Sequence, residues 1–130
     1  MLSSDQIQQW QQHGYLVLPG FKTADELAVA RDRAHAIVQA FEPSVHSSRF
    51  STRDRSLVAD AALLDSAHAV HCFFEEEALG EDGRLRVPKA QSINKIGHAL
   101  HALDPVFQAF SRGPGLAALA TDLGLVQPQV

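Results

Sequence analysis

Helix signals dominate this chain of 130 residues, and the strand signals between them are too short and too scattered to close a sheet. Caps, glycine stops and apolar spacing predict helices over residues 5–13, 24–41, 57–64, 105–112 and 114–123. Brief apolar runs predict strands at residues 15–18, 70–74, 85–87, 92–96 and 125–126. Because strands need partners, this inventory indicates an α+β fold that is incomplete within the chain.

The longest predicted helix is delimited at both ends. Thr23 and Glu26 form a capping box, in which the Thr23 hydroxyl accepts from the Glu26 amide and the Glu26 carboxylate reaches back to the cap amide. The helix should run for about 18 residues and end near Phe41, just before Pro43. Its apolar stripe is predicted to comprise Leu27, Ala30, Ala34, Ile37, Val38 and Phe41.

Two polar segments predict surface connections. Residues 44–54 are polar and irregular, which favours a loop. The run Gly80-Glu81-Asp82-Gly83 predicts a turn between two extended pieces, with residues 85–87 as the return strand.

The composition excludes several classes of protein. No apolar run approaches the roughly 20 residues that span a bilayer, and the start of the chain lacks the pattern of a signal peptide. Cys72 is the one cysteine, so no internal disulfide or multi-cysteine zinc site is expected. The net charge is −4 and the basic residues are dispersed, which argues against nucleic-acid binding. We therefore expect a cytoplasmic protein that binds neither nucleic acid nor membrane, with residues 1–130 in one domain.

Four of the seven histidines form pairs at helical spacing, His68 with His71 and His98 with His101. Two such pairs are one way to build a small metal site, although surface or capping histidines explain them more simply. The facial triad of non-haem iron oxygenases starts from a histidine with an acid two residues later. No histidine of this chain has one, so no metal ligand is assigned.

Nucleophilic catalysis has no better support in the sequence. Cys72 follows His71 inside an apolar strand candidate, which favours a buried structural thiol over a reactive one. The acidic run over residues 75–77 is typical of a solvated surface. No Gly-x-Ser-x-Gly elbow and no phosphate-binding glycine loop occurs, so no catalytic residue is assigned.

Lys95 is the strongest binding candidate because it lies between apolar residues. In a regular strand, Lys95 shares a face with Ile93 and Gly97, while Asn94 and Ile96 share the other. A lysine beside isoleucine can be directed at a pocket, where its ammonium would hold a carboxylate. Spacing alone equally allows a lysine that extends to solvent at a strand edge.

Several blocks of sequence resemble the phytanoyl-CoA dioxygenase family. The stretch Gln-Gln-His-Gly-Tyr-Leu-Val-Leu-Pro-Gly-Phe at residues 11–21 is similar to the opening of that family. The block Ser-Ile-Asn-Lys-Ile-Gly-His-Ala-Leu-His at residues 92–101, with Val87-Pro88 before it and Asp-Pro-Val-Phe at residues 104–107 behind it, is more specific and resembles the domain-containing protein 1 branch. Phe73-Phe74-Glu75 and the Asp82-Gly83 turn fit the same order, so the resemblance covers about residues 3–130.

The resemblance implies an Fe(II)- and 2-oxoglutarate-dependent dioxygenase on a double-stranded β-helix, or jelly roll. It implies that Lys95 matches a family lysine that contacts 2-oxoglutarate. The His-x-Asp motif, the distal histidine and the arginine that the family uses have no counterpart here. We therefore expect the chain to be the N-terminal helical segment plus the first strands of the jelly roll, inactive alone and holding neither cofactor tightly. The complete enzyme would act on a small-molecule or acyl substrate.

Two other interpretations stay open. A truncated, non-catalytic homologue would act as a helical interaction module through its open strand edges. A small metal protein would use one of the two histidine pairs. In every case, open strand edges predict a tendency toward self-association.

Overall fold

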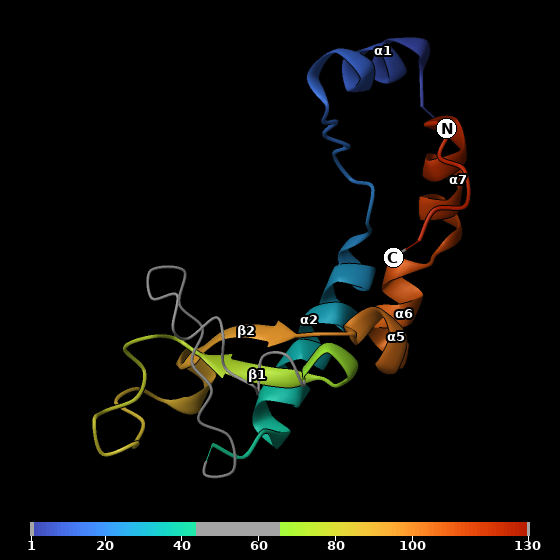
Figure 1. Cartoon of the computed structure of the whole chain (residues 1–130). Coiled ribbons are helices and arrows are strands. Elements are labelled where there is room, and N and C mark those ends of the chain that lie inside the picture. The colour runs from blue at the N-terminus through green and yellow to red at the C-terminus, as the bar shows by residue number, and fades with distance from the viewer. Residues whose placement is uncertain (1, 44–65, 130) are drawn as a thin grey trace.

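A computed structural model describes residues 2–43 and 66–129 of the chain. Its elements are shown in Figure 1. The helices are α1 (Ser4–His13), α2 (Ala24–Ala40), α5 (Leu100–Leu103), α6 (Pro105–Ser111) and α7 (Pro114–Asp122), with short 3-10 turns at Ser66–His68 and Lys89–Gln91. The strands are β1 (His71–Phe74) and β2 (Ile93–Gly97). The loop expected at residues 44–54 and the helix expected at 57–64 lie outside the described residues.

The first two helices begin where their side chains cap them. The amide of Glu26 donates to the Thr23 hydroxyl over 3.2 Å, and the Thr23 amide donates to the Glu26 carboxylate over 2.8 Å. Ser3 and Gln6 form the same reciprocal pair at the start of α1. These bonds satisfy amides that a helix start otherwise leaves unpaired. The predicted capping box and the predicted extent of α2 are confirmed.

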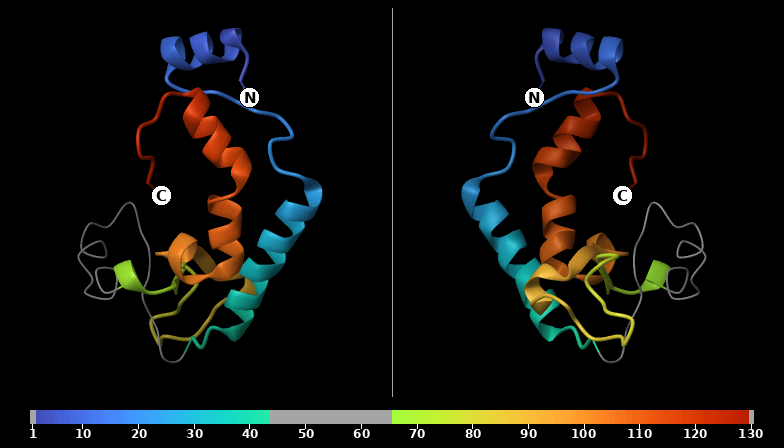
Figure 2. Two further views of the ribbon diagram at one scale, coloured as in Figure 1. Left: turned by 90° about the vertical axis from the view of Figure 1, so that its right-hand side faces the viewer. Right: turned by 90° about the vertical axis from the view of Figure 1, so that its left-hand side faces the viewer.

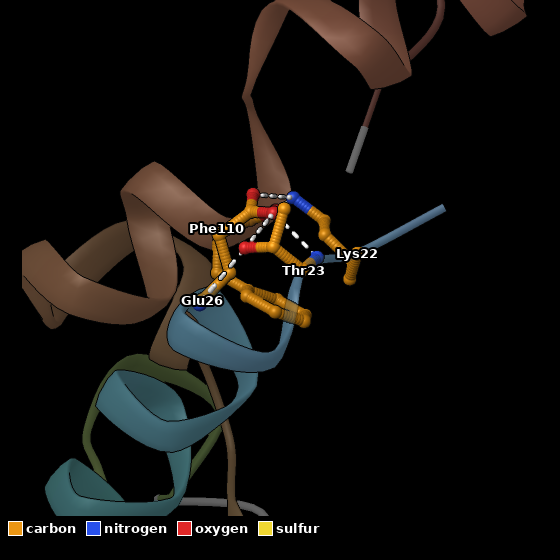
Figure 3. Close-up of polar contacts among 4 residues, drawn as sticks. All are labelled: Lys22, Thr23, Glu26 and Phe110. Atoms are coloured by element: carbon orange, nitrogen blue, oxygen red, sulfur yellow. Dashed lines mark hydrogen bonds and ion pairs between the residues drawn. The ribbon is translucent and has the colours of Figure 1, made fainter. Parts of the chain in front are cut away.

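Helices α2 and α6 pack antiparallel. Lys22, just before α2, donates to the carbonyl oxygen of Phe110 near the end of α6 over 3.0 Å, and its ammonium lies 4.5 Å from the centre of the Phe110 ring (Figure 3). Further along, Arg33 of α2 meets Asp104 at the start of α6. Figure 2 shows the two helices converging toward the sheet, with α7 continuing away from it and α1 at the far end of the molecule.

The sheet consists of β1 and β2 paired antiparallel. His71 lies opposite Gly97, Cys72 opposite Ile96, and Phe73 opposite Lys95, but Phe74 lies opposite Ile93. The register therefore shifts by one residue, and Asn94 is the extra residue of a β-bulge. One face of β2 lies toward the helices, because Ile93 and Ile96 line a depression together with Ala34 and Val38 of α2.

The hydrophobic core is small and lies under β1. Phe74, Ala78 and Leu79 are buried together, and Phe41, Leu85 and Ile93 pack against them. The predicted turn at residues 80–83 is present, since the Gly83 amide donates to the Gly80 carbonyl over 3.1 Å. The predicted return strand at 85–87 is reduced to a single bridge between Leu79 and Leu85.

Two predicted strands do not form. Residues 15–18 have no regular secondary structure and pair with no strand of the described chain, and Tyr15 and Val17 are 60% and 69% exposed. Residues 125–126 are likewise not a strand, and Val126 is 89% exposed. Both errors have one cause: an apolar run becomes a strand only where a partner supplies hydrogen bonds. The predicted stripe of α2 also fails at Leu27, which is 51% exposed.

The described residues thus form a mixed assembly of helices and one small sheet, compatible with a partial α+β fold. In the described helices, every residue is at least partly exposed to solvent. None of them is both long and apolar enough to cross a bilayer.

Candidate functional site

The side chain of Lys95 lies on one face of β2, and those of Ile93 and Ile96 lie on the other face. It lies directly opposite Phe73, and residues paired across a ladder point to the same side of a sheet. Ile93 pairs with Phe74 and belongs to the opposite face. The expectation that Ile93 shares a face with Lys95 is therefore wrong, because the Asn94 bulge breaks the alternation between them. Gly97 does share the face of Lys95, as expected, since a Cβ built on it would lie 2.9 Å from the Lys95 Cε.

His98 is the immediate partner of Lys95. The Lys95 Nζ lies 2.8 Å from the His98 Nε2. Both groups lie against the buried ring of Phe73, with 5.9 Å from Nζ to the ring centre and 5.9 Å between the two ring centres. His71 lies beside them, opposite Gly97 in the ladder and 6.5 Å from the Phe73 ring. We call Lys95, His98, His71 and Phe73 the lysine cluster.

Electrostatics in the lysine cluster favour a neutral imidazole. Burial, then the charge of Lys95, then that of His71, holds the pKa of His98 below its ordinary value of 6.5. His98 is therefore uncharged near neutral pH, and its Nε2 is able to accept a hydrogen bond from the ammonium. The tautomer follows from this geometry, with the ring proton on Nδ1.

This arrangement suits an anionic ligand. Lys95 is half-buried, and a charge beside the protein interior is screened less by water than a fully exposed one, so its attraction for a carboxylate is stronger. The Phe73 ring supplies an apolar wall beside the charge, and Gly97 leaves the space that the lysine stem occupies. The cluster has the chemistry of a small carboxylate-binding site.

The structure brings together one histidine from each predicted pair. His71 and His98, one from each pair, interact with each other across the strands. Among residues 2–43 and 66–129, no three histidine, cysteine or acidic side chains are grouped so that they could hold a metal ion. Nothing in that part of the chain therefore fits the set of ligands that an iron centre requires.

Cys72 is 3% exposed, which confirms the predicted buried thiol. Burial raises its pKa above the ordinary value, and the charge of Lys89 opposes that rise only in part. Residues 75–77 are exposed, as a solvated acidic run should be. Neither feature supplies a nucleophile.

The sequence indicates Lys95 as a binding candidate but gives little sign that His98 lies beside it. The spacing Lys-x-x-His brings two side chains together in a helix, whereas here the chain leaves the strand at Gly97 and turns His98 back. The glycine before the histidine is the one local signal of that turn.

The sequence of the chain matches a known protein family. The family model described as phytanoyl-CoA dioxygenase (PhyH) matches residues 10–129, and the chain belongs to this family. It is 41% identical over 129 residues to a protein of Arabidopsis thaliana named phytanoyl-CoA dioxygenase, covering 99% of this chain and 45% of that protein.

Relatives from an animal and an amoeba match the chain over a similar extent. The chain is 40% identical over 134 residues to phytanoyl-CoA dioxygenase domain-containing protein 1 of Bos taurus, covering 99% of this chain and 46% of that protein. It is 32% identical over 124 residues to the homologue in Dictyostelium discoideum, covering 95% and 44%. The chain spans about half the length of the curated relatives it matches.

Proposed function

We propose that this chain is the N-terminal portion of an Fe(II)- and 2-oxoglutarate-dependent dioxygenase in which Lys95 binds 2-oxoglutarate. Membership of the phytanoyl-CoA dioxygenase family supports the class of reaction. The observation that carries the role of Lys95 is its position: a half-buried lysine on the face of β2 away from the helices. That face would line the inside of the jelly roll once further strands join the sheet.

In this proposal, the chain contributes binding and not chemistry. The ammonium of Lys95 would neutralise a carboxylate of 2-oxoglutarate, and the Phe73 ring would exclude water from one side of it. The overall reaction would convert 2-oxoglutarate and O2, with a second substrate, into succinate, carbon dioxide and a hydroxylated product. The second substrate would be a small molecule or an acyl compound, and the iron ligands would lie outside the described residues.

The test is the affinity of the natural polypeptide, as its cells make it, for 2-oxoglutarate. Titration calorimetry should detect binding by the wild type, and Lys95→Ala should weaken it about tenfold or more, because a charge-assisted bond is lost. Arg84→Ala is the matched control, since it removes a positive charge from a side chain that is 88% exposed at the hairpin tip. Its affinity should stay unchanged.

Two results would count against the proposal. A wild-type protein that binds no 2-oxoglutarate and forms no succinate would remove the dioxygenase function. Equal affinity in the wild type and Lys95→Ala would leave the function standing but remove Lys95 from the site.

A further inference from the structure

The backbone of His98 is held at a defined position beside the end of the sheet. Its amide donates to the carbonyl of Ala69 over 3.1 Å, which continues the ladder by one bond past β1. Its ring packs on the buried Phe73 ring with an interplanar angle of 60°. A backbone hydrogen bond and a ring contact together leave the imidazole little freedom.

Lys95 is held differently, since its stem lies over Gly97 and its ammonium lies near the Phe73 ring. A lysine side chain has four rotatable bonds and many rotamers, so its ammonium samples a large volume unless something holds it. The 2.8 Å contact with Nε2 supplies such a hold. An ammonium has three donors, so a bond to His98 is compatible with others to a carboxylate.

We propose that His98 is a positioning residue, whose neutral ring accepts a hydrogen bond from Lys95 and fixes where the ammonium meets the carboxylate of 2-oxoglutarate. This role rests on the proposed function of Lys95. It makes binding sensitive to the protonation of His98, because a second positive charge would then face the ammonium 2.8 Å away. Within the described chain, the charges that act on His98 come from Lys95 on β2 and His71 on β1.

The first test needs no co-substrate. Nitrogen NMR shifts of the histidine rings in the natural polypeptide should show His98 with Nδ1 protonated and Nε2 unprotonated near neutral pH. Lys95→Met should raise the pKa of His98, because one of the charges that lowers it is gone, whereas burial and His71 remain. A protonated Nε2 in the wild type, or a titration unchanged by Lys95→Met, would overturn the proposal.

The second test measures 2-oxoglutarate itself. His98→Phe keeps a ring but loses the acceptor, and should weaken binding about tenfold and raise the KM more than it lowers kcat. His98→Gln offers an amide oxygen near the place of Nε2 and should recover much of the affinity. His35→Phe is the matched control, because His35 is exposed on α2 and lies at the opposite face of β2.

The outcomes separate the two proposals. If the wild type binds no 2-oxoglutarate, the function of Lys95 fails and the role of His98 fails with it. If the wild type binds and His98→Phe binds as tightly, only the positioning role is overturned. If Lys95→Met and His98→Phe each weaken binding and Gln restores it, the positioning role is supported.

Discussion

Arg33 and Asp104 lie 71 residues apart in the sequence, and their Nε and Oδ2 atoms are 2.6 Å apart in the structure. The Asp104 side chain is only 4% exposed and also accepts hydrogen bonds from the amides of Val106 and Phe107. One carboxylate therefore caps α6 and joins it to α2. The Asp-Pro pair that predicts the start of this helix thus has a second role that no local pattern indicates.

Asp104→Ala should lower the free energy of unfolding by about 2 kcal/mol, because it removes both the cap and the ion pair. Asp104→Asn keeps an acceptor for the two amides and should cost about half as much. Urea denaturation followed by circular dichroism measures both. Equal stability of the Ala and Asn variants would show that the cap contributes nothing.

The stability that Asp104 provides should depend on pH. Burial opposes its ionisation, but the bonds from Arg33, Phe107 and Val106 outweigh burial and hold its pKa below the ordinary value of 3.8. The contribution is therefore complete above that ordinary value and is lost as the pH falls through the lower pKa of the folded state. The stability difference between the wild type and Asp104→Asn should hold down to about pH 4 and shrink below it. A difference that shrinks between neutral pH and pH 5 would contradict this.

Gly97→Ala should displace Lys95 without unfolding the chain. The added Cβ would lie 2.9 Å from the Lys95 Cε, and the end of a lysine side chain moves at little cost. Thermal melts should change little, while the affinity of the natural polypeptide for 2-oxoglutarate falls. Gly115→Ala is the matched control, because its Cβ would meet Phe21 at an ordinary 3.5 Å. Undiminished affinity in Gly97→Ala would show that the path of the lysine stem is unimportant.

Cys72 should react slowly with thiol reagents in the folded protein. It is buried and its pKa is raised by burial, so the reactive thiolate is scarce and shielded. Labelling by a disulfide reagent should be slower by at least about tenfold in buffer than in concentrated urea. Equal rates in the two solvents would mean that β1 opens readily.

The outer edges of the sheet should favour association of the 130-residue chain. In the part of the chain described, β1 and β2 pair only with each other, so each leaves one edge without a strand partner. Unpaired edges serve as templates for further strands. Light scattering should show a mass that rises with protein concentration. A monomer with a sharp melt independent of concentration would contradict this prediction.

Local signals predicted the elements whose cause is local. The capping box at Thr23, the Asp104-Pro105 start and the two paired strands are present where the sequence places them. The strands expected at residues 15–18 and 125–126 are absent, because a strand needs a partner that no local pattern describes. Whether the chain completes a jelly roll depends on such partners and stays a prediction.

The candidate site was likewise predictable only where its cause is local. Lys95 was selected from its apolar neighbours and from the family resemblance; it does lie on β2, and its role in binding stays a prediction. The residues that surround Lys95 could not be predicted, because their positions depend on a register shift and on a turn after the strand. Strict alternation placed Ile93 beside Lys95, where the structure has Phe73 and His98.

The bulge at Asn94 also affects which single-codon deletions and insertions would keep Lys95 in place. Ile93 and Lys95 already pair with neighbouring residues of β1, so loss of the Asn94 codon would leave both on the faces they occupy now. Such a deletion would straighten the strand and reduce its local twist. Insertion of a further codon between Lys95 and Gly97 would instead separate the lysine from the glycine and the histidine that surround it. The strand should therefore tolerate loss of a residue before Lys95 better than gain of a residue after it.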